Sequence, residues 1–298
     1  MGSQILVTGA TGNVGGELVR LLCAKGAPPI ALVHSADKAP ALEGSCTEVR
    51  VADLRDEATV REAVRGIDRL FMLTPVTPDQ AEIGRTLVQA AAEAGVQRIV
   101  KLSIIGADLE PGIALGRWHR EMERAIEESG VAWTFLRPAG FMQNMAGLFA
   151  ATVPAQGMFF LPCGDAAVSK ADARDVSAVA ARVLLDDGWE GQALTITGPE
   201  ALTYHQIAAL MAEASERPVT YVDVPEEAAR AGLEQGGVPE PMLSAFMELW
   251  ALEKAGQAAW VTDDAERVLG RPPRGFADFA RDYAAAWKPA TEGGPAPD

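Results

Sequence analysis

The chain has few cysteines and few histidines, and each shortage excludes a class of function. Its 298 residues include three cysteines, which are widely spaced and form no C-x-x-C pair, so neither a disulfide framework nor a cysteine zinc site is expected. Its three isolated histidines form no H-E-x-x-H motif, which argues against a metal site. A chain with unpaired thiols fits the cytoplasm.

Basic residues are also in deficit. Lysine and arginine number 26 against 41 acidic residues, a net charge of −15, which disfavours nucleic acid and anionic membranes as partners. No charged-then-apolar leader precedes the first expected strand, so we expect no signal peptide. Neither a G-x-S-x-G elbow nor a G-x-x-x-x-G-K-[ST] loop occurs, which sets aside hydrolase and nucleoside triphosphatase functions.

Charge is absent from one stretch, residues 138–164. It is long enough to cross a bilayer, but its prolines, glycines and amides exclude a transmembrane helix. Its methionines and phenylalanines are therefore expected to pack inside the protein or to line an apolar pocket.

Short β-rich runs alternate with helical periodicity in the first half of the chain. The expected strands are Ile5–Thr8, Ile30–Val33, Glu48–Ala52, Leu70–Leu73, Ile99–Ser103 and Trp133–Arg137. Glycines at 26, 66, 95 and 130 mark helix ends, and Thr77-Pro78-Asp79-Gln80 predicts a helix capped by Thr77 and beginning at Pro78. The pattern predicts a doubly wound α/β fold, a parallel sheet with helices on both faces.

The alternation ends near residue 138. We expect a Rossmann-like domain at 1–137, with later strand contributions near 170–197 that include Ala193–Thr197. A smaller, mostly helical lobe is expected at 138–288, closing a pocket at the strand ends, and a flexible tail at 289–298. The capping box Thr203-Tyr204-His205-Gln206 predicts a helix start within the lobe.

A glycine-rich turn lies between the first strand and the first helix. It comprises Gly9, Ala10, Thr11, Gly12, Asn13, Val14 and Gly15. Gly9 permits the tight turn, Gly12 lets the backbone approach a pyrophosphate, and Gly15 allows close contact between the helix and the strand. The N-terminal N–H groups of the helix favour phosphates. The strand before it, the helix after it and the following βα units predict dinucleotide binding.

The G-x-x-G-x-x-G spacing resembles the short-chain dehydrogenase/reductase superfamily. In particular it is similar to the atypical NmrA-like members, including the NAD(P)H:quinone oxidoreductase and triphenylmethane reductase branch. Further matching segments, over nearly the whole chain, are Val51–Leu54, Leu73–Pro75, Val100–Ser103, Trp133–Pro138, Phe141, Asn144, Arg267–Arg271 and Phe276–Phe279.

The resemblance implies a set of cofactor contacts and a set of acceptor contacts. Besides the glycine-rich turn, the cofactor set is Asp53 and Leu54, which would flank the adenine, with Leu73, Thr74, Pro75, Ser103, Pro138 and Phe141. The alternative for Asp53 is that it caps a turn after the strand. The acceptor set is Trp118, Phe141, Met142 and Asn144. The alternative for the Met- and Phe-rich residues is ordinary core packing.

The end of the second strand bears on the choice of nicotinamide cofactor. An acidic residue there would select NAD, but the position holds His34, with Lys38 close by. This favours NADP(H), with NAD(H) as the alternative, because no carboxylate repels a 2′-phosphate. Asp37 weakens the inference, and His34 and Lys38 also fit solvated loop residues.

Typical members of the superfamily reduce carbonyls with a Tyr-x-x-x-Lys pair, and that tyrosine is missing. The chain's tyrosines are Tyr204, Tyr221 and Tyr283, all in the C-terminal half. In several atypical relatives a lysine takes over on the helix after the fifth strand, and His119 stands in its place here. We expect His119 to donate a proton or to orient the substrate, with Glu123 one turn away to orient it or raise its pKa. A structural histidine beside the buried stripe of this helix is the alternative.

Ser103, at the end of the fifth strand, has two interpretations. It matches the family's substrate-polarising serine, so its hydroxyl would bond the substrate or the nicotinamide, and a strand-ending serine that only turns the chain is the alternative. A quinone or another conjugated small-molecule acceptor fits the missing tyrosine, because the hydroquinone anion is far less basic than an alkoxide.

The sequence thus predicts an NAD(P)H-dependent reductase of a conjugated acceptor. The second hypothesis is a non-catalytic NADP-sensing regulatory protein of the NmrA-like type, and the third is an epimerase or dehydratase. The oligomeric state is open, with a homodimer among the options.

Overall fold

The computed structural model describes residues 3–42 and 44–289, which form two compact units. The first comprises Met1–Pro138, Ala173–Ile196 and Asp264–Arg271, and the second Ala139–Asp172, Thr197–Asp263 and Pro272–Asp298. The tail expected at 289–298 lies, apart from its first residue, outside the described residues.

The first unit is built on a parallel sheet of seven strands among the described residues, in the order β3-β2-β1-β4-β5-β6-β9. The strands are β1 (Ile5–Val7), β2 (Ile30–Val33), β3 (Glu48–Val51), β4 (Arg69–Met72), β5 (Arg98–Leu102), β6 (Ala132–Pro138) and β9 (Gln192–Ile196). The order reverses between β1 and β4, and the ligand site of a doubly wound sheet lies at such a switch point.

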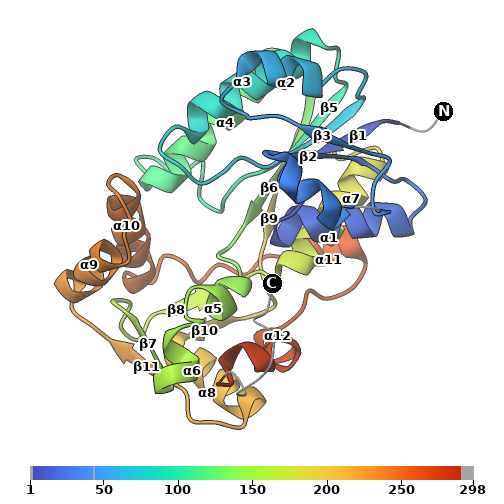
Figure 1. The fold of residues 1–298 in the computed structure, drawn as a ribbon. Coiled ribbons are helices and arrows are strands. Elements are labelled where there is room, and N and C mark those ends of the chain that lie inside the picture. The colour runs from blue at the N-terminus through green and yellow to red at the C-terminus, as the bar shows by residue number, and fades with distance from the viewer. Residues whose placement is uncertain (1–2, 43, 290–298) are drawn as a thin grey trace. The chain divides into compact units, whose positions relative to one another are not determined.

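Helices cover both faces of this sheet (Figure 1). They are α1 (Asn13–Ala24), the 3-10 helix η1 (Ala36–Leu42), α2 (Glu57–Ala63), α3 (Gln80–Glu93), α4 (Ala114–Ser129), α7 (Ala173–Leu185) and α11 (Asp264–Leu269). Helices α2, α3 and α4 pack in sequence on one face, and α1, α7 and α11 pack on the other. The predicted doubly wound fold is confirmed.

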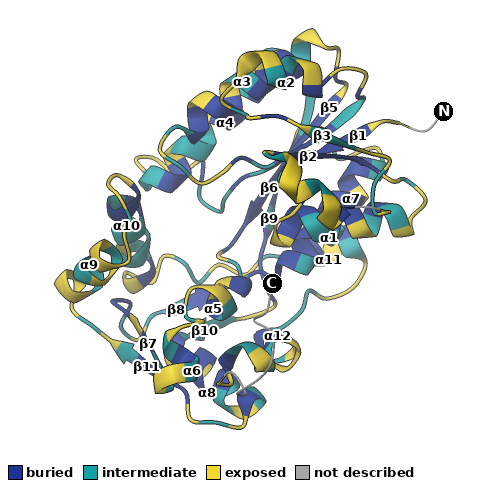
Figure 2. Cartoon of the chain, viewed as in Figure 1, coloured by how far each residue is buried: buried dark blue, intermediate teal, exposed yellow. Residues whose placement is uncertain are grey.

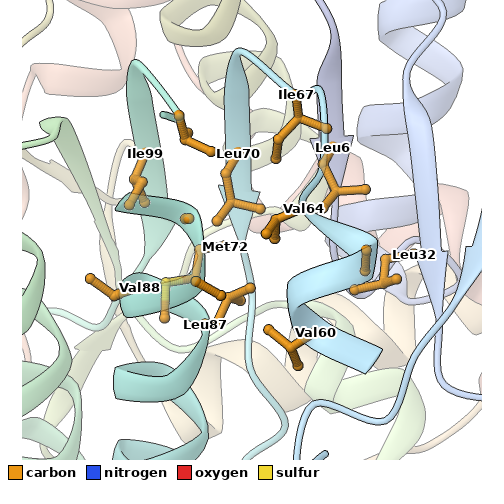
Figure 3. Close-up of a cluster of buried hydrophobic side chains, with 14 of the residues drawn as sticks. Leu6, Leu32, Val60, Val64, Ile67, Leu70, Met72, Leu87, Val88 and Ile99 are labelled. Carbon is orange, nitrogen blue, oxygen red and sulfur yellow. The ribbon is translucent and has the colours of Figure 1, made fainter. Parts of the chain in front are cut away.

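The core of the first unit forms because the inner strands are mostly apolar on both sides. Leu6, Leu70 and Ile99 face Val64 and Leu87 of the α2 and α3 segments (Figure 3), and all five are buried. Figure 2 shows the same contrast between buried strands and exposed outer helix faces. Each such side chain contributes roughly 1.5–3 kcal/mol when it leaves water, so this layer fixes the strand ends rigidly.

The strands and the glycine-marked helix ends lie close to the positions predicted from the sequence. The six early strands lie within one residue of their predicted bounds, and β9 lies one residue before its expected range. Gly26, Gly66, Gly95 and Gly130 all have positive φ at helix ends, as predicted.

The prediction of a helix start at Pro78 is wrong. Helix α3 begins at Gln80, and Asp79 is its N-cap residue. The reason is a preceding turn, in which the Gln80 N–H donates to the Thr77 carbonyl at 3.0 Å. Residues 77–79 therefore form the loop after β4 rather than the first helical turn.

The second unit contains short helices and two small sheets. Its elements are α5 (Gln143–Gly147), α6 (Thr152–Gln156), β7 (Met158–Leu161), β8 (Ala167–Ser169), β10 (Ala201–Thr203), α8 (Tyr204–Ser215), β11 (Thr220–Asp223), α9 (Glu226–Gln235), α10 (Met242–Lys254), α12 (Phe276–Asp282) and η2 (Ala284–Trp287). The capping box at Thr203 and Gln206 is confirmed. The sequence analysis did not predict β7, β8, β10 and β11, which have three or four residues each and too few alternations to recognise.

The charge-free stretch supplies much of the core of the second unit. Met142, Met145, Val153 and Phe159 are buried there, and Phe159 packs against the ring of Tyr221. Leu148, in contrast, is 70% exposed. Most apolar side chains of this stretch therefore serve packing.

Candidate functional site

The glycine-rich turn connects β1 to α1 through a close backbone contact. Gly9 has φ of +64°, and a Cβ at Gly15 would lie 2.1 Å from the Gly9 carbonyl oxygen. Real Cβ atoms do not approach an oxygen so closely, so only glycine allows helix α1 to start this near the turn. The contact predicted for Gly15 is thus with the turn itself. At Gly12 a Cβ would meet its nearest atom at 3.5 Å, an ordinary contact.

Helix α1 begins without a cap of its own. Its N-cap residue is Gly12, no side chain caps the helix, and its first turn holds no acidic residue. The first turn of α1 is held from α7 by Ser177, whose hydroxyl donates to the Val14 carbonyl at 2.9 Å. The N-terminal N–H groups and the partial positive charge of the helix are therefore held in place for an anion.

A cavity of about 420 Å³ opens beside this turn, at the carboxyl ends of β1 to β4. Its lining residues are Thr8, Gly9, Thr11, Leu32, Val33, His34, Ala52, Asp53, Leu54, Arg55, Leu73 and Pro75. Seven of these, Gly9, Thr11, His34, Asp53, Leu54, Leu73 and Pro75, are among the residues that the sequence analysis assigned to the cofactor. An apolar slot with a few polar groups suits the adenosine part of a dinucleotide.

At the end of β2, His34 and Lys38 are both exposed, and only His34 lines the cavity. The Ser35 hydroxyl holds the pKa of the nearby Asp37 carboxyl below its usual range, with smaller contributions from Lys38 and His34. Asp37 is therefore a charge already engaged by its own loop.

The end of β3 carries the predicted Asp53 and, two residues later, Arg55, which the sequence analysis missed. Asp53 accepts the Arg55 N–H at 2.9 Å, so its carboxylate turns the chain as well as lining the cavity. Arg55 also lines the cavity, and its Nε donates to Asp79 at 2.7 Å. This bond lowers the pKa of Asp79 to about 2. The position of Arg55, two residues after Asp53 at a strand end, is the sequence feature that could have indicated a cavity residue.

A second polar group of the first unit joins β5, α4 and β6. Glu123 is completely buried and accepts from Ser103 Oγ at 2.7 Å and from Arg137 Nε and Nη2 at 3.0 and 2.8 Å. Arg120 adds a contact at 3.2 Å. The expectation that Glu123 orients His119 is therefore wrong, because both its oxygens serve Ser103 and the arginines. Ser103 is 5% exposed and its hydroxyl proton is donated to Glu123, which favours the interpretation of Ser103 as a structural residue.

The partner of His119 is Lys101, which the sequence analysis named only within a matching segment. Its Nζ lies 2.9 Å from His119 Nδ1 and donates to the Leu102 carbonyl at 3.1 Å. Burial, and then the charge of Lys101, hold the pKa of His119 well below its usual range, so the ring is neutral near pH 7. The expected rise in that pKa is not present.

The remaining predicted residues divide between the two units. Thr74, Pro138 and the half-buried Trp118 belong to the first, and Phe141, Met142 and Asn144 to the second. Met142 is 1% exposed and packs in the core, so it has almost no surface for an acceptor. The roles predicted for the others stay predictions.

The chain's tyrosines lie outside the helix that usually carries the catalytic tyrosine. All three lie in the second unit, and Tyr204 is buried with its hydroxyl donating to Glu253 at 2.8 Å. Across residues 3–42 and 44–289, no group of His, Cys, Asp and Glu side chains is arranged as a metal site. In the same ranges, no helix has both the length and the apolar composition that a membrane crossing needs.

Comparison with known proteins gives a consistent result. The model of the NmrA-like family matches residues 1–268. The chain is 41% identical to an NAD(P)H azoreductase of Xenophilus azovorans over 284 residues, covering 95% of this chain and 99% of the relative.

Two solved structures extend the likeness to the whole fold. One is the NADPH-dependent quinone oxidoreductase of Escherichia coli complexed with NADPH, with a TM-score of 0.84, 29% identity and coverage of 94% of this chain and 99% of that one. The other is the triphenylmethane reductase of Citrobacter sp., with a TM-score of 0.83, 25% identity and coverage of 95% and 99%.

Proposed function

The chain belongs to the NmrA-like family, and from this premise we propose that it is an NAD(P)H-dependent reductase that transfers a hydride to a quinone-like or other conjugated small-molecule acceptor. The observation that carries the proposal is the cavity at the switch point, where Gly9 and Gly15 bring the start of α1 against the turn. The azoreductase and quinone oxidoreductase relatives support the same reaction class.

The described residues fit a dinucleotide phosphate. The uncapped start of α1, with Gly12 at its N-cap, would hold the pyrophosphate, and Leu54 and Asp53 would flank the adenine. His34 and Arg55 would face a 2′-phosphate, which supports NADP(H) over NAD(H). When bound, the cofactor supplies a hydride from its nicotinamide ring.

His119 is the group we assign to the acceptor. Its Nδ1 is engaged by Lys101, so its Nε2 is the nitrogen that would contact an acceptor atom. Trp118, the preceding residue on α4, is half-buried and would offer a flat apolar surface to a conjugated ring. This chain's residues would thus orient the acceptor and hold one proton for it, and proximity would supply much of the rate.

The cellular setting follows from the same properties. We propose the cytoplasm, because Cys23, Cys46 and Cys163 are all free. The partner is a small molecule. A non-catalytic NADP-sensing role ranks second, since relatives with 41%, 35% and 33% identity are named as reductases or an oxidoreductase.

The test is acceptor-dependent oxidation of NADPH by the purified full chain. We expect saturable loss of NADPH absorbance with at least one member of a panel of quinones, enones and azo dyes. A protein that binds NADPH in calorimetry yet oxidises it with no panel member would contradict the proposal and favour the sensing role.

A further inference from the structure

Lys101 is an unusual residue for the interior of a parallel sheet. It lies on the interior strand β5, is 1% exposed, and its register neighbours on β4 and β6 are Met72 and Phe135. A buried lysine costs folding free energy unless its charge is used or neutralised.

The direct contacts of Lys101 define the state of the histidine beside it. A lysine ammonium is a donor only, so the His119 Nδ1 atom that it contacts at 2.9 Å must present its lone pair. The single proton of the neutral ring then sits on Nε2. Among the described residues, no hydrogen-bond partner of His119 other than Lys101 is found.

The titratable and charged groups around Lys101 come from two elements. Glu123 and His119 face it from α4, and Arg137 faces it from β6. Glu123 is already bound by Arg137 on both oxygens, so it compensates the lysine only in part. As a result burial dominates and lowers the pKa of Lys101 to about 7, with Arg137 lowering it further and Glu123 opposing the shift.

We propose that Lys101 is a positioning residue of the reductase, which fixes His119 as an Nε2–H donor and replaces the proton that His119 gives up. The inference rests on the proposed function. It assigns the source of the proton to an amine inside the sheet rather than to the missing tyrosine.

The proton transfers balance as follows. The hydride adds two electrons to the acceptor and leaves an anion. The His119 Nε2–H bond breaks as an O–H or N–H bond forms on that anion, while a proton moves from Lys101 Nζ to Nδ1. Solvent then protonates Nε2, and Nδ1 returns its proton to the neutral amine. Each turnover consumes one proton from water.

The first experiment reads the tautomer without substrate or cofactor. Long-range proton–nitrogen spectra of the ¹⁵N-histidine-labelled full chain contain only three rings, and His34→Gln and His205→Gln assign them. At pH 6 we expect His119 as the neutral Nε2–H form. In Lys101→Met, which has nearly the same length without the charge, we expect mixed tautomers and a ring pKa that moves toward ~6.5.

Two results would overturn the positioning role. One is an Nδ1–H or charged His119 ring in the wild type at pH 6, and the other is an unchanged tautomer in a folded Lys101→Met. If that variant fails to fold, Lys101→Arg decides instead, because it retains a donor without a group that titrates near neutrality and should preserve the Nε2–H form.

The second experiment tests the proton supply through the pH profile of kcat. Protonated Lys101 is required, so wild-type kcat for an enone should be highest below pH 7 and fall as the pH rises through about 7. In Lys101→Met we expect this fall of kcat above pH 7 to disappear. At pH 6 its kcat should be about tenfold lower than that of the wild type, which is part of the ~10²-fold that a positioned acid supplies. Its affinity for NADPH should be unchanged.

A wild-type profile that is flat across pH 6–8 would overturn the proton supply by Lys101. If no acceptor is reduced at all, the proposed function fails, whereas the tautomer measurement still decides whether Lys101 sets the state of His119. The two failures are therefore distinguishable.

Discussion

Single residues determine whether the turn at β1 can hold a dinucleotide. The distance of 2.1 Å between a hypothetical Cβ at Gly15 and the Gly9 oxygen leaves no room for any side chain. Gly16, the next residue on the same helix, would place its Cβ 3.4 Å from the Ala10 oxygen, an ordinary contact. The two glycines are adjacent positions of the same helix that differ in their distance from the turn.

We expect Gly15→Ala to weaken NADPH binding by at least about tenfold, because the start of α1 must move away from Gly9 and tilt its N–H groups. Gly16→Ala should bind NADPH normally and stabilise the helix by up to ~1 kcal/mol. Isothermal titration calorimetry of both variants is the measurement. Equal affinities would show that the close contact is irrelevant to binding.

The role of His119 depends on the basicity of the reduced acceptor. An enone or azo acceptor becomes a basic anion that needs a proton at once, whereas a hydroquinone anion does not. His119→Ala should therefore lower kcat about 10²-fold with an enone or azo dye and less than ~10-fold with a quinone. The exposed His205 offers the control His205→Ala, with unchanged rates. A uniform loss across acceptors would argue for a structural histidine.

Glu123 gives a stability prediction. Glu123→Gln removes the buried charge that pairs with Arg137 and should cost about 3 kcal/mol of unfolding free energy in urea titration. Glu121→Gln breaks an exposed pair with Arg85 and should cost less than ~1 kcal/mol. Similar losses in both variants would contradict the assigned role of Glu123.

At the scale of elements, the residues that line the cavity lie at the ends of strands. Periodicity and glycine positions predicted the sheet because buried parallel strands are mostly apolar and follow helices that end near glycines with positive φ. The same reasoning missed Lys101 and Arg55 as site residues, since pairing across β5 and α4, or across two loops, depends on register and not on local pattern. It also misassigned Glu123, because helical spacing alone does not show that Arg137 reaches it from β6.

The end of β2 gives an element-scale prediction about cofactor choice. His34→Asp places a carboxylate in the cavity, where it would accept bonds from a ribose 2′-OH and repel a 2′-phosphate. We expect the preference for NADPH over NADH to fall by at least about tenfold, measured as the ratio of the two Kd values. His34→Asn, of the same size without charge, should shift the ratio much less. An unchanged ratio in His34→Asp would place the 2′-phosphate elsewhere.

At the scale of the whole molecule, an anionic cofactor binds a chain with a net charge of −15. We therefore expect binding to depend on local groups, namely the start of α1 and the Arg55 side chain in the cavity, rather than on the overall field. The family likeness extends over residues 1–268 and identifies the reaction class, whereas the acceptor class follows from the chemistry of one helix that lacks the usual tyrosine.

The central claim is hydride transfer from bound NADPH to a conjugated acceptor, and a single-turnover experiment with C4-deuterated NADPH tests it most directly. Enzyme in excess over NADPH is mixed with the acceptor that performs best in the panel, and NADPH absorbance is followed. We predict rapid loss of NADPH, slowed when the transferred position carries deuterium. Bound NADPH that persists with every acceptor would contradict the account.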